Sequence, residues 1–279
     1  MPITHLLAFT PLSLLLGVPI GLWKERLQKH SVKRWLLAIS PFALVPLLSL
    51  RDGAILTGSY FIGCLLGASL VGVGLTGGIA TGKSTVSSLF RTAGAVIIDA
   101  DVVAREIVLP GRGAYKEIVR YFGTEVLSDD DATINRAKLG AIIFCDPTQR
   151  KKLNAATHKY IFYEMFKQLV YQRLVCRKRL VVLDAPLLFE TKLLEYFCFP
   201  IIVVTCTETN ELSRLMKRDH MTQGDAQKRI KSQMKLYEKV SKADLIIQND
   251  GALDDLLLHT RETLQRAAAL VGASHDLQL

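Results

Sequence analysis

The sequence predicts an α/β fold in which a five-stranded parallel sheet is covered by helices on both faces. Two observations support this prediction. Short apolar runs rich in β-branched residues recur between residues 71 and 248, and segments with helical spacing of apolar residues separate them. Strands that alternate with helices are typical of parallel sheets, because two parallel strands need a crossover connection. The chain has 279 residues, of which 49% are hydrophobic, so it can bury a core without disulfides or metals.

The composition excludes several classes of protein. The high apolar content excludes intrinsic disorder. The five cysteines are widely spaced and form no C-x-x-C pair, which argues against a disulfide-stapled secreted scaffold and against a zinc site. The net charge is +9, but beyond residue 70 the 29 basic residues are interleaved with 24 acidic ones. We therefore expect no nucleic-acid partner, since such a partner needs a basic stripe.

Residues 1–69 are predicted to form a separate hydrophobic extension. Charge-free runs cover residues 6–23, 35–50 and 53–75. A membrane span needs about 20 apolar residues. The third run overlaps the predicted strand that follows it, so it is long enough for a span only if the helix continues into that next segment of the chain. Five basic residues within 24–34 would keep that loop in the cytoplasm, and three spans would return the rest of the chain to that side. The alternatives are a hairpin at the membrane surface, a targeting segment, or an incorrect gene model.

The first predicted strand, Val71–Leu75, leads directly into a glycine-rich motif. Residues Gly77 to Ser84 match G-x-x-x-x-G-K-[ST], and a predicted helix follows over Lys83–Thr92. Glycines allow backbone N–H groups to approach phosphate oxygens, at the positive end of a helix. Lys83 can reach the β- and γ-phosphates, and Ser84 can ligate Mg²⁺. The motif therefore predicts a P-loop NTPase fold with three layers, whereas a flexible glycine turn is the simpler alternative.

A second predicted strand, Ala95–Ile98, ends in Asp99-Ala100-Asp101. Polar groups at the carboxyl end of a parallel strand lie in the ligand crevice of such folds. A carboxylate at this position could orient or deprotonate an acceptor hydroxyl beside a triphosphate. The alternative is that Asp101 only caps the helix predicted over Val102–Val108.

The middle of the chain, about residues 102–178, is predicted to be a helical part that binds the acceptor. Helical periodicity covers Asn135–Phe144 and Thr148–Leu174 with no strand between them. This is too much helix for a simple crossover. His158 lies in the second segment, and for a single histidine on a helix we favour a structural role.

Three further strands complete the predicted sheet. Arg179–Leu183 ends in Asp184, the Walker B pattern that brings a carboxylate near Mg²⁺. Pro200–Thr205 and Asp244–Gln248 follow, and the latter leads into an Asn249-Asp250-Gly251 turn.

Basic helices lie between and after these strands. Glu208–Asp219 carries Arg218, and Gln223–Lys242 is polar and helical throughout. The basic residues of these segments can belong to a solvated helix face. Because the segments follow a P-loop, a mobile lid over about residues 212–240 is an equally good interpretation. One amphipathic helix is predicted after Leu258.

Together the motifs resemble those of the dephospho-CoA kinase family, and most closely the eukaryotic dephospho-CoA kinase domain-containing proteins. The resemblance runs from about Leu70 to Gly251, within a predicted domain of residues 70–279. It rests on the phrases GLTGGIATGKST, VIIDADVVAREIVLPG, FGTEVL, INRAKLGAIIF, LNAATHKYI, VVLDAPLLFET, RLMKRD and IIQNDG. It implies ATP-dependent phosphorylation of the 3′-hydroxyl of dephospho-CoA, the final step of coenzyme A biosynthesis.

The resemblance also implies roles for individual residues, with ATP and dephospho-CoA as partners and Mg²⁺ as cofactor. Asp101 would receive or position the hydroxyl proton, and Lys83 and Arg218 would stabilise the transferred charge. Ser84 and Asp184 would hold the metal. ATP would bind at Gly77, Gly78, Ile79, Ala80, Thr81, Gly82, Lys83, Ser84 and Thr85, with Asn249 near the adenine. The acceptor would lie near Thr76, Asp99, Arg105, Pro186, Leu187, Leu188, Phe189 and Glu190.

In one place the sequence departs from the family pattern. The family usually has proline after the histidine of the T-H phrase, and here Lys159 takes that position, so no acceptor role is carried over to His158. Two alternatives stay open: another P-loop small-molecule kinase, or an inactive membrane-bound nucleotide-binding module. The presence of Lys83, Ser84, Asp101 and Arg218 argues against the second. A cytoplasmic enzyme, on or off a membrane, or a mitochondrial one is compatible with the sequence, and the oligomeric state is open.

Overall fold

The computed structural model describes residues 14, 17–20, 22 and 50–277. Most of the charge-free run at 6–23, and all of the run at 35–50 except Leu50, lie outside the described residues. The structure thus covers the domain predicted over 70–279 as far as residue 277, together with the helix that precedes it.

The predicted five-stranded parallel sheet is confirmed. Its strands are β1 (Gly72–Gly77), β2 (Val96–Asp99), β3 (Val181–Asp184), β4 (Cys198–Thr205) and β5 (Leu245–Gln248). They lie in the order β2-β3-β1-β4-β5, and every pairing is parallel. All residues of β1 and β3 are buried, as expected for strands covered on both faces.

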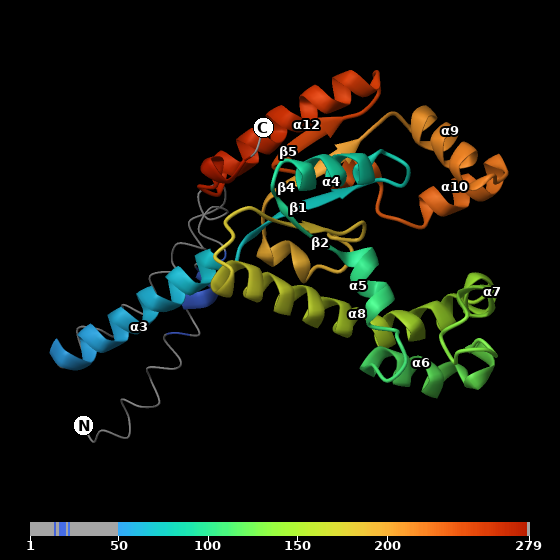
Figure 1. Cartoon of the computed structure of the whole chain (residues 1–279), viewed down its shortest axis with the longest axis horizontal. Coiled ribbons are helices and arrows are strands. Elements are labelled where there is room, and N and C mark those ends of the chain that lie inside the picture. Colours follow the sequence, from blue (N-terminus) through green and yellow to red (C-terminus); the bar gives the residue numbers. More distant parts are fainter. Residues whose placement is uncertain (1–13, 15–16, 21, 23–49, 278–279) are drawn as a thin grey trace.

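Helices cover both faces of the sheet, so the three-layer prediction is also confirmed (Figure 1). On one face, α4 (Lys83–Thr92) and α12 (Leu253–Leu270) bury side chains such as Phe90 and Leu264 against the sheet. On the other face lie α5 (Ala100–Glu106), α8 (Pro147–Val170) and α11 (Leu236–Lys242). Their buried residues include Val103, Met165 and Leu169.

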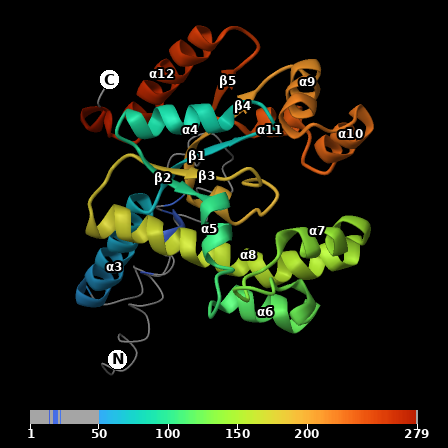
Figure 2. The ribbon, with the colours of Figure 1, turned by 45° about the vertical axis from the view of Figure 1, so that its right-hand side comes forward.

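The predicted helical middle part forms a unit beside the sheet. Helices α6 (Gly113–Phe122) and α7 (Arg136–Cys145) pack on the long helix α8, around a small core of Ile118, Val126, Leu139 and Ala156. Helix α8 continues into one π-helical turn, η3 (Tyr171–Val175). Figure 2 shows this unit across from α9 (Glu208–Asp219) and α10 (Gln223–Lys231). Short 3₁₀ turns occur at η2 (Thr124–Val126), η4 (Leu194–Phe197) and η5 (Ser274–Asp276).

The single helix predicted over Gln223–Lys242 is wrong. It is two helices, α10 and α11, separated by residues 232–235. No glycine or proline marks this break. The break lets α11 turn inward and pack against β4, where Val240 and Leu236 join the core. Tertiary packing thus overrides the local helical preference of the segment.

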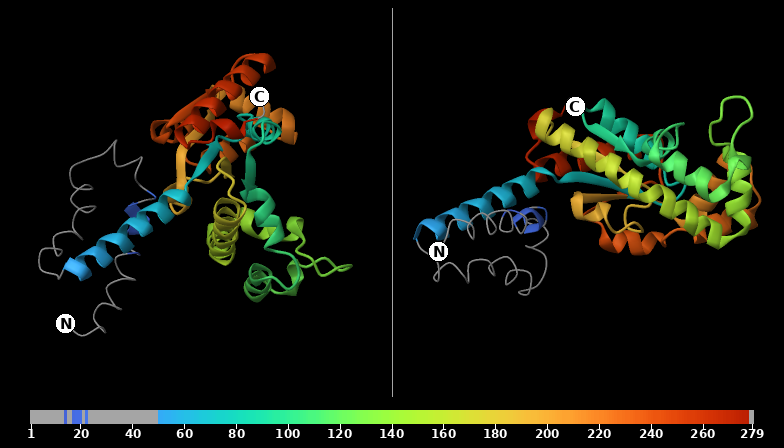
Figure 3. Two further views of the ribbon diagram at one scale, coloured as in Figure 1. Left: turned by 60° about the vertical axis from the view of Figure 1, so that its left-hand side comes forward. Right: turned by 90° about the horizontal axis from the view of Figure 1, so that it is seen from below.

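The third charge-free run, over residues 53–75, does not form one continuous helix. Helix α3 (Leu50–Ser69) ends before β1 begins at Gly72, so the run is divided between a helix and a strand. Within the described part of the chain, no helix combines the length and apolar character needed to cross a membrane. Figure 3 shows α3 extending away from the sheet.

We expect the core under α12 to contribute strongly to stability. Leu264 is 1% exposed and packs in the core, whereas Leu258 on the same helix is 56% exposed. Leu264→Ala should lower the free energy of unfolding by about 2–5 kcal/mol, because it removes buried apolar contacts and leaves a cavity. Leu258→Ala should change it by less than about 0.5 kcal/mol. Urea unfolding followed by circular dichroism measures both, and equal losses would contradict the assignment of this core.

Candidate active site

The glycine motif has the strand–loop–helix context that its sequence predicts. Strand β1 ends at Gly77 and α4 begins at Lys83. Gly82 caps α4 with a φ of 94°, and a Cβ there would lie 2.3 Å from Asn249 Nδ2. Only glycine combines that backbone angle with so close an approach.

Asn249 holds this loop from the side of β5. Its side-chain Nδ2 donates to the Thr81 carbonyl at 2.8 Å, and its backbone carbonyl accepts from Arg214 Nη1 at 2.9 Å. The Asn249 side chain is buried and does not line the large cavity beside the P-loop. In this structure Asn249 therefore fixes the shape of the loop, which sequence reasoning did not anticipate.

Asp250 fixes the turn that carries Asn249. Its carboxylate accepts hydrogen bonds from the Thr207 backbone N–H at 2.7 Å, from Asn210 Nδ2 at 2.8 Å and from Gln248 Nε2 at 3.2 Å. These donors, the Thr207 N–H first, lower the pKa of Asp250 to about 2. The turn after β5 is thus tied to the start of α9.

Lys83 and Asp184 form an ion pair at the carboxyl edge of the sheet. Asp184 is the last residue of β3 and is buried, and burial raises the pKa of its carboxyl group. The Lys83 charge and a Ser87 hydrogen bond oppose this rise, and the neighbouring Asp99 adds to it. The P-loop lysine is therefore held by a carboxylate of the adjacent strand.

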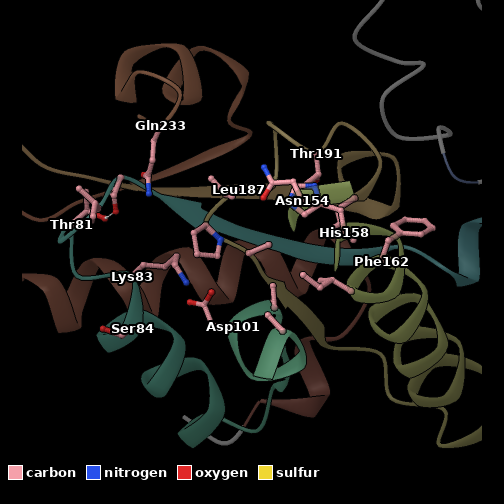
Figure 4. Close-up of a pocket in the computed structure, with 18 of the residues that line it drawn as sticks. Thr81, Lys83, Ser84, Asp101, Asn154, His158, Phe162, Leu187, Thr191 and Gln233 are labelled. Carbon is pink, nitrogen blue, oxygen red and sulfur yellow. Dashed lines mark hydrogen bonds between the residues drawn. The ribbon is translucent and has the colours of Figure 1, made fainter. Parts of the chain in front are cut away.

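Asp99 and Asp101 have different surroundings. Asp99 caps α5, since its Oδ1 accepts from the backbone N–H groups of Asp101 at 2.8 Å and Val102 at 3.3 Å. The alternative that Asp101 is the capping residue is wrong, because α5 begins at Ala100 and Asp99 occupies its N-cap position. The Asp101 side chain is exposed and lines the cavity, and Figure 4 shows its carboxylate directed toward Lys83.

A cavity of about 960 Å³ joins the P-loop, α5, α8, the segment after β3 and the α9–α10 region (Figure 4). Of the predicted site residues, those in its wall are Gly78, Ile79, Ala80, Thr81, Gly82, Lys83, Ser84, Asp101, Pro186, Leu187 and Arg218. Wall residues that sequence reasoning did not single out as site residues are Ala100, Ala104, Asn154, Ala155, His158, Lys159, Ile161, Phe162, Ala185, Thr191, Leu193, Leu194, Arg229 and Gln233.

The other predicted site residues lie behind this wall or away from it. They are Thr76, Gly77, Thr85, Asp99, Arg105, Asp184, Leu188, Phe189, Glu190 and Asn249. Thr76 is fully buried, and its hydroxyl donates to the Pro186 carbonyl at 3.1 Å. Leu188 and Phe189 are core residues. The motif phrases thus mix residues of the cavity wall with residues that support it.

Helix α8 supplies the wall opposite the P-loop. His158 lies there, although the sequence favoured a structural role for it, and burial lowers the pKa of its imidazole. Lys159 pairs with Glu117 Oε1 at 2.6 Å, and the Tyr160 hydroxyl donates to the same oxygen at 3.0 Å. The lysine that replaces the family's usual proline therefore joins α8 to α6.

Two arginines reach the cavity from the α9–α10 region. Arg218 donates to both carboxylate oxygens of Asp219, at 2.8 and 3.1 Å, and Arg229 pairs with Asp219 as well. The Arg218 hydrogen bonds hold the pKa of Asp219 below its usual range. One carboxylate therefore keeps both guanidinium groups near each other.

Comparisons with known proteins place the chain in a family. The model of the family described as dephospho-CoA kinase matches residues 71–255. A zebrafish dephospho-CoA kinase domain-containing protein is 48% identical over 194 residues, 68% of this chain and 84% of that protein. A dephospho-CoA kinase of Arabidopsis thaliana is 44% identical over 188 residues, 66% of this chain and 78% of that protein.

Two solved structures share the fold. The crystal structure of TT1252 from Thermus thermophilus superposes with a TM-score of 0.57 at 28% identity, covering 70% of this chain and 97% of that one. A dephospho-CoA kinase from Campylobacter jejuni gives 0.50 at 27% identity, covering 70% and 96%.

The Asp250 turn predicts a pH-dependent contribution to stability. The pKa of Asp250 is about 2 when folded, against about 3.9 for an unfolded aspartate, so its contribution is full above pH 4 and is lost as pH falls through 2. Asp250→Asn should therefore lower the free energy of unfolding at pH 7, and the difference from wild type should shrink toward pH 2. Urea titrations at several pH values measure it. Asp130→Asn, at an exposed loop position, is the control, and a pH-independent deficit in Asp250→Asn would contradict the assignment.

Proposed function

The chain belongs to the dephospho-CoA kinase family, and on that premise we propose that it transfers the γ-phosphoryl group of ATP to the 3′-hydroxyl of dephospho-CoA. This reaction is the last step of coenzyme A biosynthesis. The observation that carries the proposal is that Lys83 of the P-loop and Asp101 of α5 face the same cavity. A phosphate-binding cation and a free carboxylate are thus available on the two sides of a transferred group.

ATP would bind along the P-loop side of the cavity. Residues 78–84 line it, and the N–H groups of such a loop at the start of α4 favour phosphate oxygens. Lys83 would turn from Asp184 toward the phosphates, exchanging one anionic partner for another. Asn249 would act by holding the Thr81 carbonyl and with it the loop.

The residues present fit a Mg²⁺ ion that arrives with ATP. Ser84 lies in the cavity wall and Asp184 is next to Lys83 at the strand edge, so both are hard oxygen donors near the phosphates. The described residues contain no cluster of three or more metal-ligating side chains, and Mg²⁺ in such sites takes its remaining ligands from phosphates and water. When bound, the ion would offset the negative charge of the phosphates.

Dephospho-CoA would lie on the α8 side of the cavity. Phe162 offers an aromatic face there, and Asn154 and Thr191 offer polar groups. Burial lowers the pKa of the His158 imidazole and so favours its neutral form, which can both donate and accept a hydrogen bond. The helical part of about residues 102–178 would thus bind the acceptor, as the sequence predicts.

The chemistry would need little beyond position and charge. The acceptor oxygen attacks the γ-phosphorus, the bond from that phosphorus to the β–γ bridging oxygen breaks, and ADP leaves. Asp101 would accept the hydroxyl proton and release it to solvent. Lys83 and Arg218 would stabilise the negative charge that spreads over the transferred group.

The lid would be smaller than the predicted 212–240. Helix α11 packs in the core, with Lys239 fully buried, so it belongs to the fixed part. The moving part would be α10 with the end of α9, which carry Arg229 and Arg218. On closure the phosphates would compete with Asp219 for these two arginines.

An acceptor survey tests the activity itself. Purified full-length protein is mixed with ATP and Mg²⁺, and ADP release is followed by a coupled assay with dephospho-CoA, nucleosides and shikimate as acceptors. We expect dephospho-CoA to be preferred by orders of magnitude. Equal turnover of another hydroxyl acceptor would favour a different P-loop small-molecule kinase.

Asp101→Asn tests the role of the free carboxylate. The variant keeps the size and shape of the side chain but cannot accept the proton, so kcat should fall by about 10²–10⁴-fold with little change in the KM for ATP. Steady-state kinetics at saturating dephospho-CoA measures this. Glu106→Gln, an exposed position on the same helix outside the cavity wall, is the matched control and should keep full activity. A kcat for Asp101→Asn near that of wild type would remove Asp101 from the mechanism.

The hydrophobic extension of residues 1–69 would be separable from catalysis, since every residue of the cavity wall lies beyond residue 77. A chain that lacks residues 1–68 keeps the Ser69 carbonyl, which accepts from Arg173 Nε at 2.6 Å. We expect it to keep the kcat of the full chain. Loss of folding would show that the extension is part of the domain.

The same two proteins test membrane association, which stays a prediction, as does a cytoplasmic or mitochondrial location. The full chain should sediment with membranes after a carbonate wash and the truncated chain should not. Recovery of the full chain in the supernatant would reject membrane binding through residues 1–70.

A further inference from the structure

Lys239 on α11 is a buried lysine that the proposed reaction does not use. Its side chain is 0% exposed. Its Nζ donates to the Pro186 carbonyl at 2.8 Å and to the Gly77 carbonyl at 3.3 Å, and pairs with Glu190 Oε1 at 3.0 Å. An ammonium group has three N–H donors, so these three acceptors use all of them.

The three acceptors come from the two segments that form the nucleotide end of the cavity. Gly77 is the last residue of β1 and the first of the P-loop motif. Pro186 lies in the cavity wall, and its carbonyl also accepts from Thr76. One buried cation therefore fixes the entrance of the P-loop relative to the segment after β3.

Glu211 on α9 holds the same loop with the opposite charge. It is 4% exposed, and the Ile79 backbone N–H donates to it. Burial raises the pKa of Glu211, the Lys239 charge lowers it, and a Cβ at Gly78 would lie 2.5 Å from its Oε1. A loop carbonyl is thus held by Lys239 and a loop N–H by Glu211, both from outside the cavity wall.

Glu190 extends this network to the base of the lid. Its Oε1 accepts from the Met234 backbone N–H at 3.1 Å, in the break between α10 and α11. Within the described residues, its Oε2 is buried without a hydrogen-bond partner. The contacts that hold this carboxylate are therefore those of its Oε1 with Lys239 and Met234.

We propose that Lys239 is a positioning residue for the nucleotide, which shapes the P-loop from behind through Gly77 and Pro186 and ties it to the base of the lid through Glu190. The inference rests on the proposed nucleotide site, but not on the identity of the acceptor. It predicts that Lys239 determines affinity for ATP without touching it.

The test compares Lys239→Met with Lys235→Met in the full-length chain. Methionine keeps the length of the lysine stem and removes the three donors, and Lys235 is an exposed residue at the start of the same helix. Calorimetry with ATP and Mg²⁺, without acceptor, is done at a temperature where circular dichroism shows both variants folded. We expect Lys239→Met to weaken ATP binding at least tenfold and Lys235→Met to change it less than twofold.

A purely structural lysine would lower the melting temperature and leave the ATP affinity of the folded protein unchanged, and that result would overturn the proposal. Because the experiment has no acceptor, it is independent of whether wild type phosphorylates dephospho-CoA, which the acceptor survey decides.

A second variant keeps the test decisive if Lys239→Met does not fold. Lys239→Met leaves the partly buried Glu190 carboxylate without its cation, whereas the double variant with Glu190→Gln removes both charges and keeps an oxygen for Met234. We expect the double variant to fold and to bind ATP at least tenfold more weakly than wild type. An affinity within twofold of wild type would overturn the proposal.

Discussion

The parallel register of β1, β2 and β3 is the constraint on which the site depends. Asp184 on β3 is in register with Leu75 on β1 and with Asp99 on β2. The P-loop, the Asp99–Asp101 turn and the segment after Asp184 therefore start at one edge of the sheet, although the first and the last of them are about 100 residues apart in the sequence. The Lys83–Asp184 pair and the cavity between α5 and the P-loop both follow from this alignment.

Sequence patterns predict the parts of this arrangement that are local. The strands, α4 and α9 follow from apolar runs and helical spacing, and the P-loop follows from eight consecutive residues. The separate roles of Asp99 and Asp101 could not be predicted in this way. Either residue could cap α5 until it is known where β2 ends. Sequence reasoning also could not decide between contact with a ligand and support of the loop for Asn249.

Lys239 marks the limit of sequence reasoning most clearly. The segment Gln223–Lys242 that contains it is mostly polar, so its composition favours a solvated helix face, and yet the Lys239 side chain is fully buried. The groups that stabilise it, at Gly77, Pro186 and Glu190, are about 50 to 160 residues away. The position of Lys239 on the face of α11 that carries Leu236 and Val240 indicates burial, but the distant oxygen atoms that accept its hydrogen bonds cannot be predicted from the local sequence. The same holds for the break between α10 and α11.

The junction between α3 and β1 has a mechanical consequence. Only Leu70 and Val71 separate the helix from the strand, two residues reach at most about 7 Å, and Arg173 holds the last carbonyl of the helix. The helix therefore cannot swivel freely about the sheet. Because α3 is joined so closely to the strand that ends in the P-loop, the two change orientation together. Any surface that binds α3 therefore also sets the direction in which the cavity opens.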